Sequence, residues 1–127
     1  MISKEKLEGY MLKLSLTYEE AGPNTWVIKD SSKGLANVVV AAAETVVVIR
    51  VKVMKVPSRD REKFYETLLK LNASDMMHGA YAIEGEDVII LDTLEADTMD
   101  LEEFQASLDA IGFALANHYN LLKDFRN

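Results

Sequence analysis

The chain has 127 residues, of which 49% are hydrophobic and 28% are charged, a composition typical of one globular domain. It contains no cysteine and only two histidines, which excludes disulfides, thiol catalysis and cysteine-based metal centres. The net charge of −7 argues against a general nucleic-acid binder, because such proteins need cationic groups to displace counterions. We therefore expect a single domain over residues 1–127 that binds no nucleic acid.

The charge is unevenly divided along the chain. Residues 1–64 hold 11 Lys and Arg against 8 Asp and Glu, whereas residues 65–127 hold 3 against 13. An acidic second half of this kind attracts basic partners and repels nucleic acid. The alternative is a surface that only keeps the protein soluble.

The first residues are polar, and no apolar segment of the length found in signal peptides follows them. The most apolar stretch, residues 38–49, contains Glu44 and is followed by Arg50, so it is too short and too charged to cross a membrane. We expect a cytoplasmic protein with no membrane association.

The N-terminal part predicts one helix and one strand. Leu7, Met11, Leu14 and Tyr18 recur at helical spacing, which predicts a helix over residues 3–18 with Ser3 as its cap. The Gly-Pro-Asn sequence at residues 22–24 ends it. Residues 25–29 have strand composition, and residues 30–34 form a turn.

The valine-rich block over residues 35–54 is too long for one strand, and its many β-branched residues disfavour a helix. We divide it near Ala43 and Glu44 into two strands, although the turn residues there are weak. In the second strand Arg50 and Lys52 alternate with apolar residues, so one face is buried and the other is partly wet.

A second helix is expected to begin at residues 57–60, with Ser58 as N-cap, and to end at Asn72. Residues 81–83 and 88–91 predict two strands around a glycine-containing turn at 84–87. A last helix runs from about residue 98 or 100 to near the end of the chain. The order α-βββ-α-ββ-α, with short turns between strands, predicts an α+β sandwich with an antiparallel five-stranded sheet and helices packed on it.

The last helix carries the strongest pattern in the sequence. Its main apolar stripe has alternating spacings of three and four residues: Leu101, Phe104, Leu108, Ile111, Leu115, His118, Leu122 and Phe125. Phe113 and Leu121 lie off this stripe, so the helix has apolar residues on two sides. One side would pack on the sheet and the other would meet a second chain; the alternative is that both belong to one core. Gly112 either permits close approach of another backbone or is only tolerated.

No residue pattern points to chemistry. The helical neighbours of His118 can neither bind a metal nor relay a proton, and His78 is equally isolated, so we expect no catalytic residue, metal or cofactor. Nine carboxylates fall within residues 84–103 without the register of a calcium loop, and Asp100 with Glu103 forms a pattern typical of a capping box. Among the methionines, Met76 and Met77 are the best candidates for an adaptable binding surface.

Several segments together resemble a known family. The resemblance rests on the valine-rich strand at 46–53 followed by Pro57, the sequence Leu-Leu-Lys-Leu-Asn at 68–72, the strands at 79–83 and 88–91, and the helix from Leu101. In these the chain resembles the YbjN-like family, described as bacterial sensory-transduction regulators, within the type III secretion chaperone-like fold. The resemblance implies a dimeric, non-enzymatic protein, and it covers nearly the whole chain. Chaperones of this fold hold an extended segment of a client protein.

We therefore expect a homodimeric chaperone, adaptor or regulator that binds an extended segment of a protein client, in a bacterial stress or signalling response. The predicted partner or dimer surface consists of Val46, Val48, Phe113, Leu121 and Phe125. The alternative is a small-ligand-binding regulatory domain with a pocket between sheet and helices. A hydrolase with an unrecognised carboxylate site is a third, weaker hypothesis.

Overall fold

The computed structural model describes residues 2–126. Within that range the elements follow one another as α1 (Lys4–Lys13), β1 (Tyr18–Gly22), β2 (Thr25–Asp30), the short 3-10 helix η1 (Ser31–Lys33), β3 (Leu35–Ala42), β4 (Val46–Lys55), α2 (Arg61–Ser74), β5 (Ala80–Glu84), β6 (Asp87–Glu95), α3 (Leu101–Asn117) and α4 (Tyr119–Lys123).

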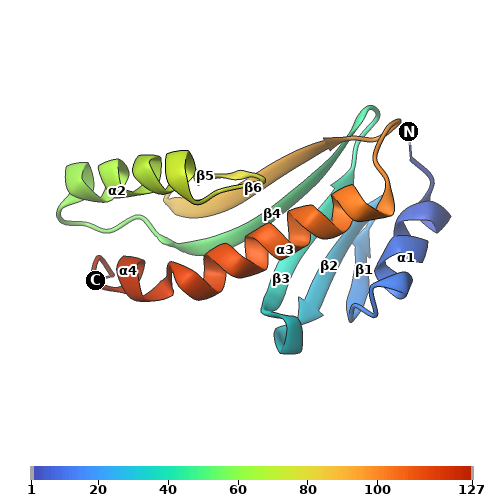
Figure 1. Cartoon of the computed structure of the whole chain (residues 1–127), viewed down its shortest axis with the longest axis horizontal. Coiled ribbons are helices and arrows are strands. Elements are labelled where there is room, and N and C mark those ends of the chain that lie inside the picture. Colours follow the sequence, from blue (N-terminus) through green and yellow to red (C-terminus); the bar gives the residue numbers. More distant parts are fainter. Residues whose placement is uncertain (1, 127) are drawn as a thin grey trace.

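The strands form one antiparallel sheet in the order β1-β2-β3-β4-β6-β5. The first four strands are sequential neighbours. After β4 the chain passes through α2 to the far edge, where β5 lies, and β6 returns between β5 and β4 (Figure 1). The predicted α+β class and the antiparallel pairing are confirmed, but the sheet has six strands within the described residues and not five.

The additional strand is β1, which the sequence did not predict: Tyr18, its first residue, was assigned to the end of the first helix, and residues 19–21 to no strand. The helix ends at Lys13, because Leu14 closes it and Ser15 adopts a left-handed φ of 56°. Tyr18 then pairs with Ile28 on β2. The Gly-Pro-Asn sequence at residues 22–24 is therefore a hairpin turn and not the end of a helix. Tyr18 continued the helical spacing only because its side chain also packs against the core.

The second helix also differs from its predicted bounds. Its N-cap is Asp60, in the left-handed conformation, and not Ser58. Asn72 does not end the helix. Its side-chain amide donates to the Tyr81 carbonyl oxygen (3.2 Å), and its side-chain oxygen accepts from the Tyr81 backbone N–H (2.7 Å). This reciprocal pair satisfies part of the free edge of β5, which an exposed edge strand would otherwise offer to another chain.

The last helix covers one face of the sheet, crossing it in front of β3 and β4 (Figure 1). The predicted apolar stripe faces the sheet: Phe104, Leu108, Ile111, His118 and Leu122 are buried, and Leu101, Leu115 and Phe125 are partly buried. The helix is not continuous, because it divides at His118 into α3 and α4.

The opposite face of the sheet carries half-buried apolar side chains that do not contact the core: Val27, Val39, Ala41, Val46, Val48 and Leu91. We call these residues the open sheet face. Strand register places them together, since Val27 pairs with Val39 and Ala41 pairs with Val48. At one side an ion pair between Arg50 and Glu84 spans β6. By strand alternation the pair lies over Ile89, which is only 3% exposed.

Gly112 faces the η1–β3 segment of its own chain. A Cβ built at this position would lie 3.6 Å from the Leu35 side chain and 3.6 Å from the Lys33 carbonyl oxygen, which is ordinary van der Waals distance. The helix therefore tolerates this glycine and does not need it.

We predict that Gly112→Ala raises the free energy of unfolding by about 0.5–1 kcal/mol, because alanine has the higher helix propensity and fits the space. Urea denaturation measures the change. Gly79→Ala is the matched comparison, since Gly79 has a φ of +78° and its Cβ would lie 3.0 Å from the Leu91 carbonyl oxygen. That variant should lose stability. A destabilised Gly112→Ala protein would contradict the packing described for α3.

Candidate functional site

The residues predicted to form one partner surface lie on different sides of the molecule. Val46 and Val48 belong to the open sheet face. Phe113 and Leu121 lie on the helical side and are 57% and 48% exposed. Phe125 is partly buried and packs edge-on against the Phe64 ring, with 5.1 Å between the ring centroids. The chain therefore offers two separate apolar surfaces, one on the sheet and one on α3.

A groove of about 650 Å³ lies beside α3, between that helix and the segment that joins α2 to β5. We call it the α3 groove. The small side chains of Ala106 and Ala110 and the ring of Phe113 form its α3 wall. Met77, which is 85% exposed, and His78 line it from the α2–β5 segment. Because most of its lining is apolar, the groove suits an apolar side chain of a ligand or partner.

Phe113 also borders a second hollow, of about 240 Å³, on the other side of α3. Leu14, Leu16 and Leu35 contribute to that hollow. Since Asp109 and Phe113 line both spaces and are one turn apart on α3, they form a ridge between them. A bound segment can therefore cross α3 and contact apolar surface on both sides of this ridge.

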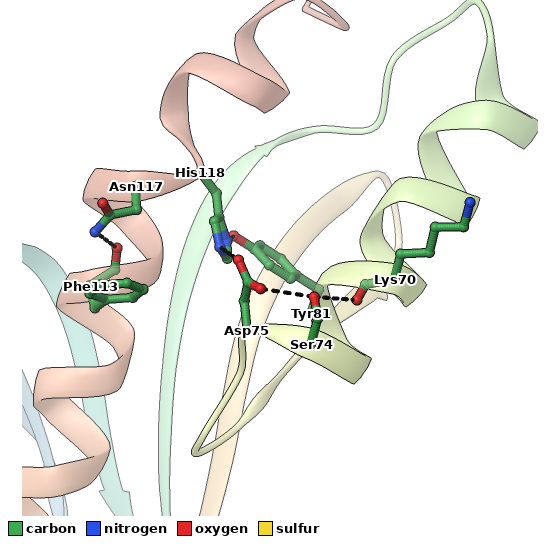
Figure 2. Close-up of polar contacts among 7 residues, drawn as sticks. All are labelled: Lys70, Ser74, Asp75, Tyr81, Phe113, Asn117 and His118. Carbon is green, nitrogen blue, oxygen red and sulfur yellow. Dashed lines mark hydrogen bonds and ion pairs between the residues drawn. The ribbon is translucent and has the colours of Figure 1, made fainter.

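A polar cluster around His118 includes two residues that line the α3 groove, Ser74 and Asp75 (Figure 2). The imidazole Nε2 lies 3.0 Å from Asp75 Oδ2, and Nδ1 lies 2.7 Å from the Tyr81 hydroxyl. A carboxylate can only accept, so the neutral ring carries its proton on Nε2 and Nδ1 accepts from Tyr81. Ser74 also donates to Asp75, over 2.8 Å. The cluster joins the end of α2, strand β5 and the break between α3 and α4.

The environment keeps Tyr81 protonated and Asp75 ionised. Burial raises the pKa of the Tyr81 phenol, and the negative charge of Asp75 raises it further. Hydrogen bonds from Ser74 and His118 lower the pKa of Asp75. Tyr81 is only 6% exposed, so its hydroxyl does not reach the groove. This carboxylate–imidazole–hydroxyl chain therefore holds elements together and presents no activated nucleophile at the surface.

His118 lies on the predicted apolar stripe of the last helix, and the structure buries it. Its hydrogen-bond partners could not be predicted, because Asp75 and Tyr81 are 43 and 37 residues away in the chain. The local sequence around His118 is apolar and carries no signal for either partner. Only the path of β5 beside α2 brings them together.

The acidic segment at residues 84–103 has local structural roles. Asp100 and Glu103 form the predicted capping box at the start of α3, with both hydrogen bonds present. Asp92 accepts a hydrogen bond from the buried Ser107 hydroxyl over 2.7 Å, which fixes α3 on β6. Within residues 2–126, no three histidine, aspartate or glutamate side chains come together as a metal site would require.

None of the helices formed by the described residues has both the length and the apolar character that a membrane span requires.

We predict that Tyr81→Phe lowers the free energy of unfolding at neutral pH by about 1–3 kcal/mol, because Nδ1 of the buried His118 loses its donor. The variant should also remove part of the pH dependence of the free energy of unfolding. The unfolded chain ionises this phenol near its usual pKa of about 10, whereas the folded protein keeps it neutral, so stability falls as pH rises above that value.

Urea denaturation of both proteins at several pH values tests this prediction. The wild-type protein should lose more stability than Tyr81→Phe between neutral and strongly alkaline pH. Equal losses would show that Tyr81 is not the group responsible.

Comparison with solved structures identifies the fold. The chain superimposes on YbjN from E. coli with a TM-score of 0.67 and 11% sequence identity, covering 93% of this chain and 92% of that one. It matches the Yersinia pestis type III secretion chaperone SycH, solved in complex with a fragment of YscM2, with a TM-score of 0.64 and 13% identity, covering 89% and 96%.

A third match is to the heterodimeric ExoU–SpcU complex of the Pseudomonas aeruginosa type III secretion system. Here the TM-score is 0.62, with 10% identity and coverage of 87% of this chain and 93% of that one. No curated protein matches the chain in sequence. These structural matches establish a shared type III secretion chaperone-like fold. In sequence, the CesT_Tir_1 family profile matches residues 2–127, and the chain belongs to that family.

Proposed function

We propose that this protein is a non-enzymatic chaperone or adaptor that acts as a homodimer and binds a segment of another protein. The observation that carries the proposal is the α3 groove, where Phe113 and Met77 remain largely exposed beside the small side chains of Ala106 and Ala110. Large apolar side chains gathered at a hollow typically mark an interaction site. Several proteins of similar fold were solved with protein partners, as in the SycH–YscM2 and ExoU–SpcU complexes.

The side chains around the groove favour binding over catalysis. His118 uses both ring nitrogens in buried hydrogen bonds, and the Tyr81 hydroxyl is committed to that ring. His78, in contrast, lies at the groove among apolar neighbours. A general base needs a second group to orient it, and the structure gives the His78 side chain no hydrogen bond or ion pair with any residue in the range 2–126.

Partner binding through the groove predicts a specific loss in one variant. Affinity purification of the tagged wild-type protein from its own cells should recover a partner protein, and Phe113→Asp should reduce that recovery at least about tenfold, as loss of a central apolar anchor does. Leu12→Asp is the matched control, because Leu12 on α1 is 66% exposed and lies outside the groove. Equal losses in both variants, or none in Phe113→Asp, would contradict the assignment of the groove.

The open sheet face supports the homodimer. Its members are valine, alanine and leucine side chains in register on neighbouring strands, and no core residue covers them. A two-fold symmetric contact brings the same patch of each subunit together, which suits a flat, self-complementary apolar face. We therefore assign Val46 and Val48 to the dimer contact, and Phe113 and Leu121 to the partner contact.

This assignment predicts that mutations in the two surfaces have different effects on the oligomeric state. Light scattering during size exclusion should give the wild-type protein a mass near twice 14.2 kDa. Val48→Glu should give the monomer mass, because a carboxylate would be buried without a partner. Phe113→Asp should remain dimeric, and circular dichroism should be unchanged in both. A wild-type monomer at low and high concentration would contradict the dimer, and a monomeric Phe113→Asp would place the contact on α3 instead.

A small-molecule regulator is the second candidate function. The α3 groove has the volume of a typical ligand site, and Ser74, Asp75 and His78 add polar groups to its lining. This function predicts that a metabolite raises the melting temperature of the wild-type protein but not that of Phe113→Asp.

A further inference from the structure

The charges at the α3 groove restrict which partner segments it accepts. Two carboxylates border the apolar lining: Asp109 on α3 and Asp75 at the end of α2. No lysine or arginine is among the described residues that line the groove. An apolar hollow with negative charge on both walls favours a ligand that combines apolar and cationic groups.

The two carboxylates differ in what they already bind. Asp75 accepts hydrogen bonds from Ser74 and His118, and these contacts lower its pKa, so it is ionised at neutral pH. Both donors are formally neutral when the imidazole is neutral, so they orient the carboxylate without cancelling its charge. Asp109 is exposed, and the structure gives its side chain no hydrogen bond or ion pair with any other residue in the range 2–126. Its negative charge is available to a partner.

The net charge of the whole chain, −7, has the same sign. All residues that line the groove fall within the second half of the chain, which holds 13 acidic residues against 3 basic ones. Such a field draws a basic segment towards the groove and slows the approach of an acidic one. The ridge of Asp109 and Phe113 then places one carboxylate and one aromatic ring one helical turn apart, facing both hollows of α3.

We infer that the α3 groove binds a short protein segment in which a large apolar side chain is flanked by lysine or arginine. The apolar side chain packs between Phe113, Met77 and the alanines of α3. The flanking cation lies at Asp109, and a second cation reaches Asp75 on the opposite wall. This inference rests on the proposed function, and it adds the chemistry of the partner segment to it.

A selection from random peptides displayed on phage tests the inference without a known partner. The full-length wild-type protein is the target, and Phe113→Ser is used to remove peptides that bind elsewhere. Selected peptides should be enriched in Leu, Phe or Met next to Lys or Arg. If Phe113-dependent peptides emerge without basic residues, the charge inference is wrong and the proposed function survives. If no Phe113-dependent peptide emerges, both are wrong.

Fluorescence anisotropy of the strongest selected peptide then isolates the charge contribution. Asp109→Asn should weaken binding about threefold to tenfold, and added salt should weaken wild-type binding but have less effect on the variant. Asp124→Asn is the matched control, since Asp124 is an exposed carboxylate near the C-terminus that does not line the groove. Unchanged affinity in Asp109→Asn, or equal loss in Asp124→Asn, would overturn the inference.

Discussion

His118 connects parts of the chain that are far apart in sequence, and the shape of the α3 groove depends on this connection. Its ring lies at the point where α3 ends and α4 begins. One nitrogen is tied to Asp75 after α2, and the other to Tyr81 on β5. Because Asp75 also lines the groove, these hydrogen bonds connect one wall of the groove to the C-terminal end of α3. Buried networks of this kind rigidify a structure when every member has a partner.

The sheet explains why two apolar surfaces remain after folding. The buried stripe of α3 packs against the core side of β2, β3, β4 and β6. Among the described residues, the apolar side chains on the other face of the sheet and on the outer side of α3 therefore stay partly exposed. Burial of Phe113 or of the valines within a single subunit would need another helix. A second copy on the sheet and a protein segment on α3 are the occupants that we propose.

Sequence reasoning predicted the fold where the signal was local and periodic. The apolar stripe of α3, the capping box of Asp100 and Glu103, and the hairpin between β5 and β6 all follow from short-range patterns. It failed for β1, because the spacing of Tyr18 suited a helix as well as a strand that packs on the core. The exposed Phe113 was found from its position off the stripe. The groove itself was not found, since it depends on where the α2–β5 segment lies beside α3, which no local pattern specifies.

The central claim is that the α3 groove binds a segment of another protein. Its most direct test is site-specific photo-cross-linking in cells, with a photoreactive phenylalanine analogue at position 113 or, for comparison, at position 12 on α1. The account predicts a cross-link from position 113 to a different protein, at a peptide that contains an apolar residue beside Lys or Arg, and no such product from position 12. Cross-links from position 113 only to a second copy of this chain, or none at all, would contradict it.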